Sequence, residues 1–127
     1  MEALNNMAEI SPLEIVRIAD EKGKQFANIK THQIRNFFSE INALKLSSDK
    51  QESEGALRTR IVLLKPKLAY ATGRKPNELR PFYELMTTAI DGVMRSDENH
   101  FKIALNNFIM LVESIVAYHR FYGGRDN

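Results

Sequence analysis

The sequence predicts an all-α protein that folds as one compact five-helix bundle. Apolar residues recur at three- and four-residue steps through most of the chain, which is the period of an amphipathic helix. No stretch shows the sustained alternation of a strand, and there is no internal repeat or low-complexity tract. Because 127 residues suffice to bury one core, we expect a single helical domain over residues 1–127.

The first helix is predicted over residues 12–26, after a flexible lead-in formed by residues 1–10. Ser11 is a typical N-cap, Pro12 suits the first helical position, and Glu14 can complete a capping box. The apolar stripe that follows is thin. The prediction of this helix therefore depends more on its N-terminal capping signal than on the periodicity of its apolar residues.

The second helix is predicted to begin at Thr31, whose hydroxyl can act as the N-cap, and to end near Leu46. Five apolar residues recur along it at helical spacing: Ile34, Phe37, Phe38, Ile41 and Leu44. The polar residues 47–54 are expected to form a loop or the first turn of the next helix.

The third helix is predicted over residues 53–71, where four apolar residues form a continuous buried seam: Leu57, Ile61, Leu64 and Leu68. Pro66 lies inside this helix. Because proline removes one backbone donor and crowds the preceding turn, we expect a kink or a break there.

A fourth helix is predicted to start near Pro81, after a connection over residues 75–80. A turn at residues 96–99 leads to the fifth helix, predicted over residues 100–122. This last helix is apolar over more than half of its circumference, so it is either the central helix of the bundle or an interface for another protein.

The composition excludes several classes of protein. Cysteine is absent, so the chain has neither disulfides nor thiolate metal sites, and a reducing compartment is expected. No continuous apolar run approaches the roughly 18 residues of a membrane span, and residues 1–11 lack the blocks of a signal peptide. We therefore expect a cytoplasmic protein.

A catalytic constellation is not visible in the sequence. The three histidines, His32, His100 and His119, lie on different predicted segments and do not pair at i, i+4 spacing. Asp97 precedes His100 by three residues, but di-iron bundles need such a motif twice. Glu113, within the last helix, is expected to point outward or to meet a basic partner. We predict no enzymatic activity, no metal site and no cofactor.

Positive charge is concentrated in residues 58–80. Seven basic residues stand there against one acid, Glu78, which gives +6 where the whole chain carries +2: Arg58, Arg60, Lys65, Lys67, Arg74, Lys75 and Arg80. On an ideal helix Arg60, Lys67 and Arg74 fall within about 40° of one another on one side of the seam, and Arg58 and Lys65 flank the other side. Such a row can contact successive phosphates, although a solvated helix face explains the charge equally well.

A second candidate patch lies at the start of the second helix, where backbone N–H groups favour anions: Lys30, Thr31, His32, Gln33 and Arg35. Ordinary capping by Thr31 is the alternative. Tyr70 and His119 could stack on bases, but packing at the edge of the core is the expected role of both.

Five segments together resemble the small subunit of type III-A CRISPR effector complexes, the Csm small-subunit family: residues 31–38, 64–70, 73–74, 81–83 and 108–124. The resemblance covers about residues 13–124. It implies a helical protein without nuclease activity, several copies of which stack along the guide RNA beside the backbone subunit. It also implies RNA contacts, chiefly to the sugar–phosphate backbone, from Thr31, Gln33, Arg35, Lys65, Lys67, Tyr70 and Arg74.

The expected function is therefore that of a non-catalytic RNA-binding subunit in antiviral defence. Charge alone adds Arg58 and Arg60 to the candidate RNA contacts, and the patch at the start of the second helix adds Lys30. The expected partners are guide and target RNA, the backbone and large subunits of the complex, and further copies of the chain, with no membrane. The alternative is a helical protein–protein adaptor whose last helix docks a partner and whose basic residues only increase solubility.

Overall fold

The computed structural model describes residues 2–124, and in that range it is all-α, without strands. The α-helices are α1 (Pro12–Gln25), α2 (Thr31–Asp49), α3 (Glu54–Val62), α4 (Leu64–Arg74), α5 (Pro76–Met94) and α6 (Phe101–Phe121). Two short 3-10 segments complete the chain, η1 (Glu2–Asn5) and η2 (Phe26–Asn28). Since α3 and α4 are the two halves of the predicted third helix, the five-helix layout is confirmed.

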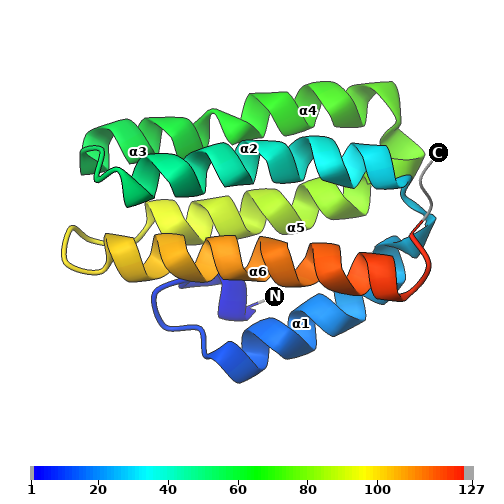
Figure 1. Cartoon of the computed structure of the whole chain (residues 1–127), viewed down its shortest axis with the longest axis horizontal. Coiled ribbons are helices and arrows are strands. Elements are labelled where there is room, and N and C mark those ends of the chain that lie inside the picture. The colour runs from blue at the N-terminus through cyan, green and yellow to red at the C-terminus, as the bar shows by residue number, and fades with distance from the viewer. Residues whose placement is uncertain (1, 125–127) are drawn as a thin grey trace.

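The long helices run alternately up and down the bundle (Figure 1). The starts of α2 and α5 meet the ends of α1, α4 and α6 at one end, on the right in Figure 1. Helix α6 is the central helix and packs against α1, α2 and α5. It is also the one helix within residues 2–124 that is long and apolar enough to cross a membrane, and the core accounts for its apolar face.

The third predicted helix breaks at Leu63, three residues before the proline that causes the break. Pro66 has no N–H for the carbonyl of Val62, four residues earlier, and its ring crowds that carbonyl. Helix α3 therefore ends at Val62 and α4 begins at Leu64. The seam continues across the break, because all four of its predicted members are buried: Leu57, Ile61, Leu64 and Leu68.

The first residues of the chain pack into the core, contrary to the expected flexible lead-in. Leu4 and Met7 are fully buried, and Asn107 on α6 donates a hydrogen bond to the carbonyl of Met7 (2.8 Å). The chain passes so close to α5 that a Cβ at Gly92 would collide with the carbonyl oxygen of Leu4. A few isolated apolar residues give no periodic signal, which is why the sequence did not reveal this segment.

Two predicted helix boundaries are wrong by about one turn. Helix α2 continues past Leu46 to Asp49, because Ser48 is buried and its hydroxyl accepts a hydrogen bond from Lys102 (2.8 Å). Helix α5 starts at Pro76 instead of Pro81. Proline is favoured at the first helical position, so the predicted connection over residues 75–80 is mostly the first turn of α5.

The predicted start of α1 is confirmed. Ser11 and Glu14 form the capping box, with the Glu14 N–H donating to the Ser11 hydroxyl (3.1 Å) and the Ser11 N–H to the Glu14 carboxylate (3.2 Å). At the other end of α1, Gly23 lies against α6, where a Cβ would collide with Tyr118. The absence of a side chain at Gly23 thus permits the close crossing of α1 and α6.

Candidate nucleic-acid interface

The seam of α3 and α4 separates the basic residues into two rows, as the helical geometry predicts. Arg60, Lys67 and Arg74 border a groove between α2 and the α3–α4 pair. Arg58 and Lys65 face α5 and the turn that follows it. The two rows differ in what their charges contact.

Arg58 is held by the protein itself. Its guanidinium donates to Glu54 (2.8 Å) and to the carbonyl oxygens of Met94 (3.1 Å) and Ser96 (2.7 Å). It also lies 4.5 Å from the centroid of the Phe101 ring. Arg58 therefore fastens the end of α5 to α3, and its guanidinium is engaged within the protein; the RNA contact predicted for it stays a prediction.

Three further basic residues of the two rows form ion pairs with half-exposed carboxylates. Lys65 pairs with Asp91 (2.8 Å) and Lys67 with Glu40 (2.6 Å). Arg60 pairs with Glu52 (3.1 Å), and this hydrogen bond holds the pKa of the Glu52 carboxyl below its ordinary value. Exposed pairs of this kind contribute only about 0–1 kcal/mol, so they can open when a stronger ligand is present.

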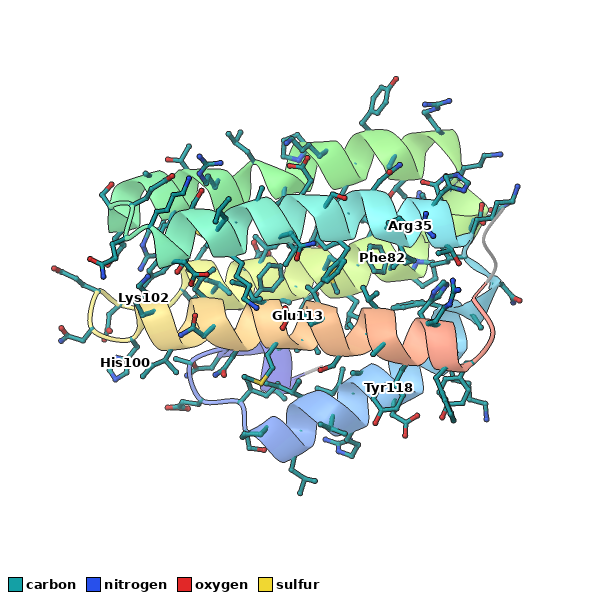
Figure 2. All side chains as sticks on the ribbon, in the orientation of Figure 1. Arg35, Phe82, His100, Lys102, Glu113 and Tyr118 are labelled. Carbon is teal, nitrogen blue, oxygen red and sulfur yellow. The ribbon has the colours of Figure 1, made fainter. Side chains whose placement is uncertain are left out.

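Unpaired positive charge gathers at one end of the bundle. Lys30 precedes α2, Arg74 ends α4, Lys75 links α4 to α5, and Arg80 lies on α5. All four are exposed, and within residues 2–124 none of them forms an ion pair. We call these four residues the basic end. Arg35 lies near the start of α2 at this same end, far from His100 and Lys102 (Figure 2).

The acid at the basic end is Glu78, on the first turn of α5. Its carboxylate accepts a hydrogen bond from the backbone N–H of Lys30 (3.3 Å), so it joins the start of α2 to the start of α5. This contact orders the chain but leaves the ammonium of Lys30 without a carboxylate among the described residues.

Tyr70 lies beside the basic end and is 71% exposed, so the expectation that it packs at the edge of the core is wrong. The guanidinium of Arg74 lies 5.9 Å from the centroid of its ring. His119 behaves as expected, because it is buried and its Nε2 lies 2.8 Å from the carbonyl oxygen of Ile29. Of the two candidate stacking residues, only Tyr70 is accessible.

Thr31 does not cap α2. The N-cap is Lys30, without a side-chain hydrogen bond, and Thr31 is the first helical residue. Its hydroxyl is enclosed, with no hydrogen-bond partner among the described residues, so it is not part of the surface. The neighbouring Gln33 is half-exposed and faces the groove together with Asn36, which the sequence reasoning missed. Gln33 and Asn36 are three residues apart, so helical spacing alone could have predicted that both lie on the same face of α2.

Three adjoining cavities form the groove between α2 and α3–α4. A cavity of about 380 Å³ opens at the basic end, and its lining includes His32, Tyr70, Arg74 and Lys75. A second, of about 210 Å³, has an apolar floor and shares Gln33, Asn36 and Ala71 with the first. A third, of about 140 Å³, lies near Arg60 and Leu63. The groove thus extends from the basic end to the break between α3 and α4.

The acidic side chains that the sequence singled out, Asp97 and Glu113, meet their partners in pairs. No group of three or more histidine, aspartate or glutamate side chains in this range could hold a metal ion. Asp97 and His100 form an exposed pair (2.6 Å), and this hydrogen bond lowers the pKa of the Asp97 carboxyl. Glu113 meets Lys45 (3.2 Å), the basic partner expected for it.

These features define a small all-α bundle with one basic end and a groove that leads away from it. The family model described as Csm2 Type III-A matches residues 9–125, and the chain belongs to this family. It is thus a small subunit of type III-A CRISPR effector complexes, as the sequence resemblance predicted. Comparisons with curated proteins and with solved structures gave no match.

Proposed function

We propose that this small subunit holds the sugar–phosphate backbone of guide or target RNA at its basic end. The supporting observation is that Lys30, Arg74, Lys75 and Arg80 lie at one end of the bundle and form no ion pair within residues 2–124. Unpaired cations near one another attract phosphates through their combined field, and binding releases counterions. The subunit leaves sequence recognition to base pairing and contributes no catalysis of its own.

The groove-facing row has a secondary part in this proposal. Lys67 and Arg60 form exposed ion pairs, which cost little to exchange for a phosphate. With Arg74 they line the groove along α3 and α4. A strand bound at the basic end would therefore meet further cations along the groove.

The subunit also takes part in assembly of the complex in the cytoplasm. Its partners are the backbone and large subunits and further copies of itself. Large apolar side chains that remain exposed offer contacts to other proteins: Leu13, Leu46 and Phe121. The adaptor alternative rests on the apolar character of α6, but most of that character is explained by burial in the core.

The experiment compares charge reversal at two places on the surface. Arg74→Glu combined with Lys75→Glu changes the basic end, and Arg17→Glu combined with Lys50→Glu makes the same change of net charge elsewhere. We expect the first variant to weaken retention of RNA at least tenfold and the second to change it much less. For single strands the slope of log K against log salt should flatten by about 1.4, since two phosphate contacts are lost.

Two results would contradict the proposal. Equal retention by both variants, with helical content preserved in the circular dichroism spectrum, would show that the basic end does not hold RNA. Turnover of labelled RNA by the purified chain in the presence of divalent metal would contradict the absence of catalysis.

A further inference from the structure

The second cavity of the groove is a pocket with an aromatic floor. Phe37, Leu68, Leu79 and Phe82 line it, and the rings of Phe37 and Phe82 meet edge to face with centroids 5.4 Å apart. Figure 2 shows Phe82 pointing into the bundle from α5. At about 210 Å³ the pocket is smaller than the roughly 300–1,000 Å³ of sites for drug-sized ligands. It suits one flat ring system with apolar faces.

The rim of this pocket carries polar groups. Gln33 and Asn36 border it from α2, and within residues 2–124 neither side-chain amide has a hydrogen-bond partner. Each amide offers both donors and an acceptor, so it can meet either kind of group on the edge of a heterocycle. The ion pair of Lys67 and Glu40 lies on the same rim. An apolar floor beneath unpaired amides matches a nucleobase, which has apolar faces and a polar edge.

The pocket is continuous with the cavity at the basic end. Gln33, Asn36 and Ala71 line both, and the cavity at the basic end also carries Arg74 and Lys75. A ligand that fills both spaces therefore needs a flat ring attached to negative charge. A nucleotide of a single strand has this arrangement, whereas an aromatic protein side chain would require acidic neighbours to match it.

We propose that the pocket between α2 and α4 takes an unpaired nucleobase of an RNA strand whose phosphates lie at the basic end. This inference rests on the proposed function and adds to it a site for the base itself. The floor offers apolar contact to any base, and the amides can rotate to suit donors or acceptors, so occupancy does not depend strongly on sequence.

The experiment compares two strands that differ only in their bases. The full chain is titrated with a short oligouridylate and with an abasic strand of the same length, which carries the same phosphates. We expect the oligouridylate to bind about tenfold more tightly, because base stacking contributes about that much per base. Ala71→Leu places a larger side chain between the two cavities, and it should remove this difference by lowering the affinity for the oligouridylate more than the affinity for the abasic strand.

A matched control lies on the same helix. Ala69 is exposed and does not line the pocket, so Ala69→Leu should keep the full preference for the strand with bases. Gln33→Ala combined with Asn36→Ala provides a second test that leaves the core intact, and it should lower the affinity for the oligouridylate more than the affinity for the abasic strand.

Several outcomes would overturn the assignment. Equal affinity of the wild-type chain for both strands would refute the pocket and leave the proposed function standing, whereas no salt-sensitive binding of either strand would refute both. A preference that survives in Ala71→Leu but is lost in Tyr70→Ala would place the base on Tyr70 instead. A loss of subunit assembly in Ala71→Leu, with the preference intact, would assign the pocket to a protein side chain.

Discussion

The two ends of the α3–α4 pair use the same kinds of residue in opposite ways. In α3, Arg58 is enclosed by a carboxylate, two carbonyl oxygens and an aromatic ring. At the end of α4, Arg74 and Lys75 are exposed and form no ion pair within residues 2–124. A charged segment in a sequence shows how much charge is present, but the fold decides which charges remain available to a ligand.

Arg58 and the basic end differ because different hydrogen-bond acceptors lie near them. Arg58 lies beside the end of α5, where the carbonyl oxygens of Met94, the last helical residue, and of Ser96, in the turn that follows, attract a cation. Glu54, one turn earlier on α3, completes its environment. At the basic end Glu78 instead accepts a hydrogen bond from the backbone N–H of Lys30.

The largest effect is expected from removing Arg58, which tests whether this residue stabilises the fold and does not bind RNA. Arg58→Ala should lower the free energy of unfolding by about 2–3 kcal/mol, because it deletes hydrogen bonds from a charged group that hold the end of α5. Urea denaturation would measure the loss. The affinity for RNA should not change in the folded variant, and a weakened affinity would show that Arg58 contacts RNA after all.

A smaller effect is expected from Glu40, the partner of Lys67. Glu40→Gln removes the charge that holds the Lys67 ammonium, so this cation becomes available in the groove. We expect RNA to bind about two- to fourfold more tightly, the equivalent of an exposed ion pair, with little change in stability. Glu84→Gln, on the exposed surface of α5, is the control and should leave affinity unchanged. Weaker binding by Glu40→Gln would contradict a role for Lys67.

The smallest effect concerns pH. The Arg60 guanidinium lowers the pKa of the Glu52 carboxyl, so the unfolded chain takes up a proton at a higher pH than the folded protein. The pair therefore stabilises the fold above the ordinary glutamate pKa of about 4.3, and this stabilisation is lost as the pH falls toward the lowered value. The stability difference between wild type and Glu52→Gln should thus shrink on acidification from neutral pH. A difference that stays constant would show that the pair makes no pH-dependent contribution.

The helices were predictable because their signals are local. Ser11 and Glu14 mark the start of α1, and the apolar seam in α3 and α4 has helical spacing. Pro66 predicts the break between α3 and α4. The division of basic residues into two rows followed from the same geometry. Local patterns are thus sufficient to place most elements and the sides on which their charges lie.

The availability of each charge was not predictable, since it depends on residues distant in sequence. Lys67 meets Glu40, which lies 27 residues away, and Arg58 meets carbonyl oxygens 36 and 38 residues away. The basic end exists only because the starts of α2 and α5 meet the end of α4 (Figure 1). The groove and its pocket likewise depend on how far apart α2 and α4 lie, which no pattern within either helix specifies.

The contact between Leu4 and Gly92 also bears on how the chain folds during translation. Residues 3–10 leave the ribosome well before α5, the helix against which they pack. Docking of this first segment therefore cannot precede synthesis of α5, and Asn107, which binds the carbonyl of Met7, comes later still. Residues 3–10 thus join the bundle only after α5 has been made, through contacts of very long sequence separation.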